Sequence, residues 1–381
     1  MSRIMDSSPE GRQKKLFTPG PLSCTMAVKQ AMLHDYGSRD AEFIDIVKDV
    51  RQRLLDIAGA SPVEWSIVPL QGSGTYCVEA AIHTAVPRDK DARVLVLSNG
   101  AYGRRLAQIC AAADLSHDVL EFGEAQPYDL AKVERQLSSR AYACVAAVHC
   151  ETSCGLLNPV EALASSLRAR QPGAAFVVDA MSSFGALPVR LDRVHFLVAS
   201  ANKCVQGVPG FGFVLARTQR LAQCAGNART LSLDLAAQHD EMERSGQFRF
   251  TPPTHALLAA QQALRELEAE GGPAARRRRY EHNASLLVAG ARELGLRPLL
   301  PADALCPVIT AFLYPRHARF AFADFYQRLS ALGQVIYPGK ITSVECFRIG
   351  CIGDLYPNDV KHLLKCIGQV LEDMGVPIPV P

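Results

Sequence analysis

Short apolar runs alternate with helical segments along the first two thirds of the chain. The runs predict strands at residues 65–70, 93–97, 144–149, 175–178, 195–199 and 212–216. Helical segments begin between them, at Thr75, Tyr102 and Pro159. Short strands that are separated by helices form a mostly parallel sheet with both faces covered. We therefore expect an α/β fold.

The pattern changes after two long helical segments at residues 255–270 and 273–294. Beyond Leu296, strand-like runs (308–313, 335–337, 346–349) mix with two helices (322–332, 357–374). A chain of 381 residues also exceeds the ~250–300 residues that one core usually reaches. We expect an N-terminal arm at residues 1–15, a large domain at 16–275 and a smaller α+β domain at 276–381.

Charge and hydropathy exclude several classes of partner. The formal net charge is only +3, which gives no reason to expect nucleic acid. The run Arg276–Arg279 is expected on a solvated helix face. No apolar run approaches the ~20 residues of a membrane helix, and residues 1–15 lack the apolar core of a signal peptide. We expect a cytoplasmic protein without a membrane partner.

The cysteines favour the same compartment. All 12 are scattered along the chain, several within apolar runs. This distribution is typical of reduced thiols rather than of a disulfide framework. Cys150 and Cys154 form a C-x-x-x-C pair, but no second pair of ligands has suitable spacing, so we expect structural thiols and no metal site.

Two charged residues at neighbouring strand ends indicate the chemistry. Asp179 ends the apolar run at 176–178, and Lys203 follows the run at 195–199 after a short polar turn. A lysine can form a Schiff base with an aldehyde, and an aspartate can keep a pyridine nitrogen protonated. The pair therefore suits an enzyme that uses pyridoxal phosphate.

Other strand ends carry polar groups of the kind that bind ligands. Ser73, Gly74 and Thr75 open a helix after a strand and suit a phosphate, although a lone G-x-G is equally an ordinary capped turn. Tyr102 could stack on a planar ring or simply begin a helix half-buried. Thr152 could donate to a cofactor oxygen or belong to an ordinary loop. Because open parallel sheets bind ligands at this edge, the convergence favours the functional interpretation.

Arg348 lies within an apolar run of the C-terminal part. A buried guanidinium is costly without an anion, and its planar fork fits a carboxylate or a phosphonate. The alternative is a structural ion pair with an aspartate or glutamate.

The chain resembles the 2-aminoethylphosphonate–pyruvate aminotransferases, a family in the class V branch of fold-type I pyridoxal phosphate enzymes. The resemblance runs from about Leu16 to about Met374. It rests on these segments: Phe17-Thr-Pro-Gly-Pro-Leu, Leu70-Gln-Gly-Ser-Gly-Thr-Tyr, Ser98-Asn-Gly-Ala-Tyr-Gly, Val178-Asp-Ala-Met-Ser-Ser-Phe-Gly, Ser200-Ala-Asn-Lys-Cys-Val-Gln-Gly, Leu231-Ser-Leu-Asp-Leu, Ile336-Tyr-Pro-Gly-Lys and Phe347-Arg-Ile-Gly.

The resemblance implies a role for each residue above. Lys203 would be the Schiff-base lysine and Asp179 the partner of the pyridinium. Tyr102 would stack on the cofactor ring, and Thr152 would meet its phenolic oxygen. The cofactor phosphate would be bound by Ser73, Gly74, Thr75, Ser200 and Thr251. Thr251 would come from the neighbouring subunit, so a homodimer is implied. Arg348 would bind the anionic group of an amine donor and of a keto-acid acceptor.

The implied reaction is the transfer of an amino group from 2-aminoethylphosphonate to pyruvate. Two segments depart from the family pattern: Thr152-Ser-Cys-Gly155 has fewer hydroxyls, and the stretch His34–Asp40 differs among relatives. The nearest alternative is another class V aminotransferase, of the alanine–glyoxylate or serine–pyruvate type. A cysteine desulfurase is disfavoured because this chain has no cysteine on an obvious long mobile loop. A nucleotide-binding oxidoreductase would leave Lys203 unexplained, and the presence of all these chemical groups argues against a non-enzymatic scaffold.

Overall fold

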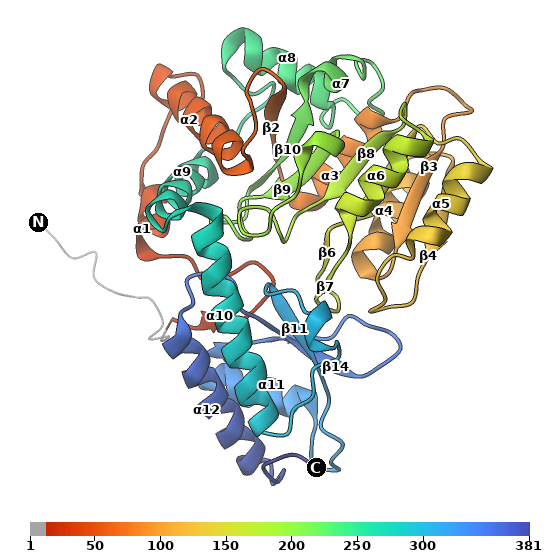
Figure 1. Ribbon diagram of the computed structural model, residues 1–381. Helices are drawn as coiled ribbons and strands as arrows, with labels where there is room; N and C mark the ends of the chain where they lie inside the picture. The colour runs from red at the N-terminus through yellow and green to blue at the C-terminus, as the bar shows by residue number, and fades with distance from the viewer. Residues whose placement is uncertain (1–12) are drawn as a thin grey trace, which may run out of the picture.

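The computed structural model describes residues 13–381, and a seven-stranded sheet dominates its larger part (Figure 1). The strand order is β2-β10-β9-β8-β5-β3-β4. The bounds are β2 Trp65–Gln71, β3 Val94–Ser98, β4 His117–Glu121, β5 Cys144–Val148, β8 Ala175–Asp179, β9 Phe196–Ser200 and β10 Phe211–Arg217. The strand β10 is antiparallel to both of its neighbours, β2 and β9, and the other neighbouring pairs of this sheet are parallel. The prediction of a mostly parallel α/β sheet is confirmed.

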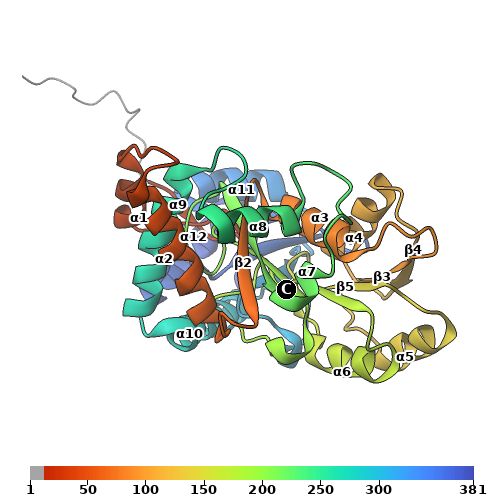
Figure 2. The same cartoon turned by 90° about the horizontal axis from the view of Figure 1, so that it is seen from above.

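Helices cover both faces of this sheet (Figure 2). One layer holds α2 (Ala41–Ala58), α5 (Leu130–Ser139), α6 (Val160–Arg170) and α9 (Thr254–Ala269). The other holds α3 (Gly74–Ala85), α4 (Ala101–Ala112), α7 (Thr218–Ala222) and α8 (Leu235–Ser245). Successive residues of a strand point to opposite faces, so Phe176 and Val177 of β8 are buried in different layers. This explains why the central strands read as continuous apolar runs.

Several helices and strands were not predicted from the pattern of apolar residues. The strand β4 lies at the edge of the sheet and is only partly buried, and its sequence, His117-Asp-Val-Leu-Glu, holds just two apolar residues. The helices α1 (Met26–Gln30), α5 and α8 were also not anticipated, because each buries few residues.

The C-terminal part contains a second, antiparallel sheet. Its order is β11-β14-β13, with bounds Ile309–Leu313, Cys346–Gly350 and Tyr337–Pro338. It packs with α10 (Gly272–Glu293), α11 (Phe322–Ala331) and α12 (Pro357–Asp373) around the buried rings of Phe312, Phe325 and Phe347. The short strand β1 (Lys15–Leu16) joins this part by pairing with β12 (Gln334–Val335).

The expected domain limits stay a prediction. Residues 1–12 of the expected N-terminal arm lie outside the described residues, whereas Lys15 is held by β12. The expected limit at 275/276 falls inside the first turn of α10, a helix that runs from the large sheet down to the small one (Figure 1).

No helix within residues 13–381 combines the length and the apolar character that a bilayer span requires. All twelve cysteines are free thiols and are buried.

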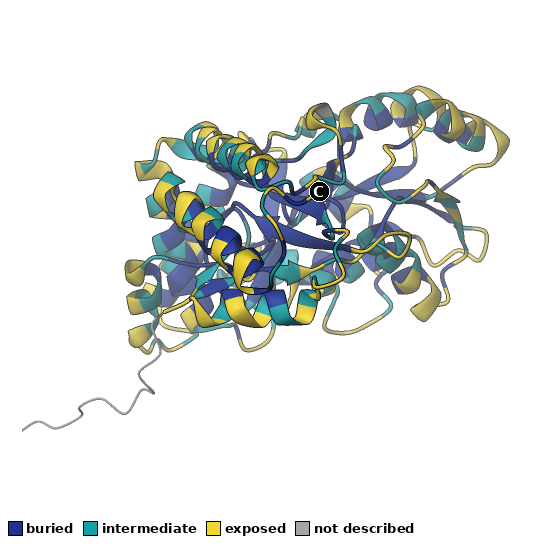
Figure 3. Ribbon diagram, turned by 90° about the horizontal axis from the view of Figure 1, so that it is seen from below, coloured by how far each residue is buried: buried dark blue, intermediate teal, exposed yellow. Residues whose placement is uncertain are grey.

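The arginine run at the start of α10 is not a solvated face, and that expectation is wrong for two of its four residues. Arg276 is 1% exposed and donates from Nε to Glu270 Oε2 (2.6 Å) and from Nη1 to the Cys204 carbonyl (2.7 Å). Arg279 donates from Nε to Glu270 Oε1 (2.8 Å). The two arginines are three positions apart and therefore share the inner face of the helix, whereas Arg277 is exposed. Exposed and buried residues lie on different sides of the helices at the surface (Figure 3).

Removal of Glu270 should therefore destabilise the protein far more than removal of an exposed carboxylate. We expect Glu270→Ala to lower the free energy of unfolding by about 3 kcal/mol, because it leaves the buried Arg276 unpaired. Glu281, whose ion pair with Arg277 is 2.6 Å long and about half exposed, supplies the control, and Glu281→Ala should cost less than about 1 kcal/mol. Urea unfolding of both variants measures this. Equal losses would contradict the prediction.

Candidate active site

The residues singled out at strand ends meet at one edge of the large sheet. Asp179 is the last residue of β8 and Ser200 the last of β9, with Lys203 three residues beyond. Thr152 lies in the segment that follows β5, and Tyr102 lies in the first turn of α4, the helix that follows β3. Since β9, β8, β5 and β3 are consecutive parallel neighbours, their carboxyl ends lie together, as in other open sheets that bind ligands there.

Asp179 is buried with little compensation for its charge. Its Oδ1 accepts a hydrogen bond from the Met181 amide (2.9 Å), and its carbonyl accepts one from the His149 amide (2.9 Å). Burial, together with the negative charge of Glu151, raises the pKa of the Asp179 carboxyl to about 6. A carboxylate in this position is stabilised by any cationic or proton-donating group placed next to it.

Lys203 is enclosed by the N-terminal segment of the chain. Its Nζ donates to the Pro19 carbonyl (2.7 Å), and burial lowers its pKa below the usual value. Gly20 has a φ of 118°, and a Cβ built there would lie 2.5 Å from Lys203 Nζ. Only glycine therefore fits above the lysine. Nothing in the sequence indicated that this segment folds over Lys203.

Glu151 orients Tyr102 and was not anticipated. The carboxylate is fully buried, and its Oε2 accepts hydrogen bonds from the backbone amides of Tyr102 (3.1 Å) and Gly103 (3.2 Å). It therefore occupies the N-terminus of α4, where an anion is stabilised by free amides and the helix dipole. The carboxylate thereby fixes where Tyr102 enters the site.

Three cations surround the Tyr102 phenol. Burial alone would raise its pKa, but the positive charges of Lys203, Lys340 and Arg348, with a hydrogen bond from Thr152, hold it below the usual value. The ring also faces the Arg105 guanidinium, whose carbon lies 5.0 Å from the ring centroid.

Arg348 is buried without a carboxylate partner. It is 2% exposed, and it donates from Nε to the Pro338 carbonyl and from Nη1 to the Thr152 carbonyl, both at 2.9 Å. No ion pair involves it within residues 13–381, so the alternative of a structural ion pair is not what the structure shows. Burial lowers its pKa. A buried guanidinium with free donors is suited to an external anion.

The start of α3 provides a cradle for a second anion. No side chain caps this helix at Ser73, so its first amides are available to a ligand. A Cβ at Gly74 would collide with Met181, which explains the glycine. Thr75 Oγ1 accepts a hydrogen bond from Arg105 Nη1 (3.3 Å). Arg105, on α4, was not identified from the sequence.

Among residues 13–381, no hydrogen bond or ion pair joins two of the expected residues, Ser200 and Thr251, to this group. Ser200 donates its hydroxyl hydrogen to Asn202 (2.8 Å). Thr251 is exposed and lines a pocket of about 420 Å³ that also contains Gly72 and Tyr76, next to the cradle in sequence. The roles of both residues at the phosphate stay predictions.

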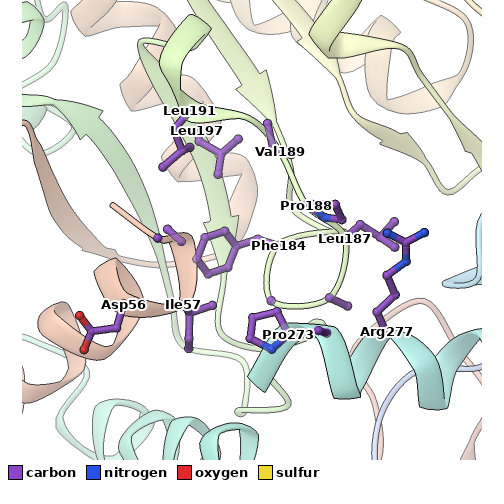
Figure 4. Close-up of a pocket in the computed structure, with 15 residues that line it drawn as sticks. Asp56, Ile57, Phe184, Leu187, Pro188, Val189, Leu191, Leu197, Pro273 and Arg277 are labelled. Atoms are coloured by element: carbon purple, nitrogen blue, oxygen red, sulfur yellow. The ribbon is translucent and has the colours of Figure 1, made fainter. Parts of the chain in front are cut away.

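Another pocket, of about 390 Å³, lies between the end of α2, the loop at 184–189 and the start of α10 (Figure 4). Its lining is mainly apolar, with Asp56 and Arg277 at opposite ends, and includes none of the expected site residues. In the described part of the chain, no group of three or more histidine, cysteine, aspartate or glutamate side chains could hold a metal ion.

Comparison with known proteins identifies the family of the chain. Residues 27–313 match the family model described as aminotransferase class V. The chain belongs to the class V aminotransferases. This membership confirms the fold class and the transfer of amino groups inferred from the sequence.

Three individual proteins are similar to this class V aminotransferase over nearly its whole length. The chain is 47% identical over 364 residues to the 2-aminoethylphosphonate–pyruvate transaminase of Pseudomonas aeruginosa PAO1, covering 95% of this chain and 97% of the relative. It is 48% identical over 361 residues to the protein of that name from Aeromonas hydrophila, covering 93% and 94%. The crystal structure of ureidoglycine–glyoxylate aminotransferase from Bacillus subtilis superimposes with a TM-score of 0.87 at 22% identity, covering 97% and 96%.

The burial of Asp179 predicts that the cofactor-free protein becomes less stable to unfolding as this carboxyl loses its proton. Its pKa is about 6 when folded and about 3.9 when unfolded, so folding favours the protonated form. The stability that the protonated carboxyl contributes is present at low pH and is lost as pH rises through about 6. The free energy of unfolding of Asp179→Asn, measured relative to that of the parent, should therefore rise by about 2–3 kcal/mol between pH 4 and pH 8. Urea unfolding at both pH values measures this, and a pH-independent difference would contradict it.

Proposed function

We propose that this class V aminotransferase uses pyridoxal 5'-phosphate to transfer the amino group of 2-aminoethylphosphonate to pyruvate, giving phosphonoacetaldehyde and L-alanine. Relatives with 46–48% identity over nearly the whole chain carry this name. In the structure, the proposal rests on Arg348, a buried guanidinium that interacts electrostatically with Tyr102 and Lys203 and has no carboxylate partner among residues 13–381.

The residues present fit pyridoxal phosphate. The uncapped start of α3 suits its phosphate, and Asp179 suits its pyridinium nitrogen, because a cation there relieves the cost of the buried carboxylate. Lys203 lies within electrostatic reach of Asp179 and Tyr102. When bound, the cofactor supplies an electron sink for the carbon that loses its proton.

Each side chain then has a separate task. Lys203 accepts and returns a proton, and its burial lowers its pKa from the usual value, which brings it closer to the range of a general base. The Pro19 carbonyl accepts a hydrogen bond from its Nζ, and Gly20 packs against its side chain. Arg348 holds the anionic end of each substrate, phosphonate in one half-reaction and carboxylate in the other.

A homodimer is part of the proposal. Thr251 would reach the phosphate of the neighbouring subunit, and large apolar side chains are exposed around it: Tyr76 is 52%, Phe250 51% and Leu231 74% exposed. A surface of this kind fits burial against a second copy. We place the protein in the cytoplasm, since twelve free thiols suit a reducing compartment.

A donor and acceptor screen tests the proposed reaction. Cofactor-loaded enzyme should form alanine from 2-aminoethylphosphonate and pyruvate faster than from any other amine tested, and Lys203→Ala should abolish this turnover while cofactor still binds. Borohydride should trap cofactor on the parent but not on the variant. Faster turnover of alanine with glyoxylate, or of serine with pyruvate, would instead favour the alternative class V activities.

Replacement of Arg348 should weaken both half-reactions. Lysine keeps the charge but loses the planar fork, and a lost hydrogen bond to a charged group costs about 1.5–3 kcal/mol. Arg348→Lys should therefore lower kcat/KM about tenfold to hundredfold with 2-aminoethylphosphonate and with pyruvate. Single-turnover kinetics with each substrate measures this, while the absorbance of bound cofactor should stay unchanged. Parent rates with both substrates would exclude Arg348 as the anion site.

A further inference from the structure

Lys340 brings a second positive charge to the Arg348 side of the site. Its Nζ lies 4.9 Å from the centroid of the Tyr102 ring, and it acts on the Tyr102 phenol together with Lys203 and Arg348. The residue follows β13, the strand that pairs with the Arg348 strand β14. No carboxylate forms an ion pair with Lys340 within the described chain.

Hydrogen bonds between the two parts of the molecule fix the loop at residues 339–345, which carries Lys340. Glu124, in the loop after β4, accepts hydrogen bonds at Oε2 from the amide and hydroxyl of Thr342 (2.8 and 3.1 Å) and from the amide and hydroxyl of Ser343 (both 3.3 Å). Its Oε1 accepts from Arg104 Nη2 (2.8 Å) on α4, the helix that carries Tyr102. The position of Lys340 over Tyr102 is therefore built by both parts of the chain.

The charge of the two substrates differs, and Arg348 alone does not distinguish them. Pyruvate carries one negative charge, whereas a phosphoryl-type group carries about −1.5 to −2 near neutral pH. Arg348 supplies one positive charge, and two of its five donors already bind the Pro338 and Thr152 carbonyls. A second cation nearby would match the extra charge of the phosphonate.

We propose that Lys340 binds the phosphonate of the amine donor together with Arg348, so that the pair selects a doubly charged anion over a carboxylate. The inference rests on the proposed function and adds a specificity-determining residue to it. Glu124 is a positioning residue in this arrangement, since it acts through the loop of Lys340. The carboxylate of pyruvate is held by Arg348 and needs no second cation.

The experiment measures binding of two anions that cannot react. Ethylphosphonate and propionate are titrated into the cofactor-loaded enzyme by calorimetry at pH 8. Lys340→Gln should weaken the binding of ethylphosphonate about tenfold, which is the effect of one lost charged contact. It should weaken the binding of propionate less than about twofold. Lys340→Arg should keep most of the preference. Lys365→Gln, which removes an exposed charge from α12, is the control and should change neither affinity.

Kinetics and pH separate a binding role from a merely structural one. Lys340→Gln should raise KM for 2-aminoethylphosphonate and leave KM for pyruvate near the parent value. In the parent, the preference for ethylphosphonate should grow as the pH rises and the second phosphonate charge forms, and Lys340→Gln should flatten this rise. Glu124→Gln should also raise KM for 2-aminoethylphosphonate and flatten the pH dependence of the preference for ethylphosphonate. The double variant of Glu124→Gln with Lys340→Gln should show no further loss beyond that of Lys340→Gln alone.

Two results would overturn the inference and each has a different meaning. If Lys340→Gln binds ethylphosphonate as tightly as the parent while Arg348→Lys does not, Lys340 is only a neighbour of Tyr102. If both anions weaken equally, Lys340 attracts anions without selecting between them. If the parent enzyme itself neither turns over 2-aminoethylphosphonate nor prefers ethylphosphonate, the proposed function fails rather than the role of Lys340.

Discussion

Burial of charge at one edge of the large sheet is the constraint on which this structure depends. Removing a charge from water is costly unless the protein supplies compensating dipoles or an opposite charge. Glu151 is compensated by the amides at the start of α4, and Arg348 by two backbone carbonyls. Asp179 has a single amide. The unequal compensation leaves Asp179 and Arg348 ready for a ligand, whereas Glu151 serves the scaffold.

The site also depends on how the two parts of the chain are joined. The hairpin of β6 (Cys150–Glu151) and β7 (Leu156–Leu157) extends from the large sheet toward the small one. Arg348 binds the carbonyl of Thr152 in this hairpin, and the Cys306 amide donates to the Gly155 carbonyl (2.9 Å). A Cβ at Gly155 would lie 2.4 Å from the Ile309 carbonyl oxygen. The proposed anion site at Arg348 therefore depends on the packing of both parts against each other.

Sequence reasoning identified the residues whose place follows from strand topology. Asp179, Lys203, Tyr102 and Thr152 could be grouped because parallel strands end at one edge. Glu151, Arg105, Gly20 and Lys340 could not, since their importance comes from contacts between segments far apart in the chain. The expectation for Arg276 was wrong for a related reason. A run of arginines reads as exposed, and only the packing of α10 against Glu270 and the Cys204 loop shows which members are buried.

The sequence by itself determined the α/β class, the lysine and aspartate at neighbouring strand ends, and the resemblance that led to the aminotransferase family. These properties depend on periodicity and on residues close in sequence, which local physics controls. The tertiary structure decided that Pro19 and Gly20 lie over Lys203, that Glu151 fixes Tyr102, and that Glu124 brings Lys340 beside it. Such contacts join residues separated by many positions, and their energies arise only when distant surfaces pack and exclude water.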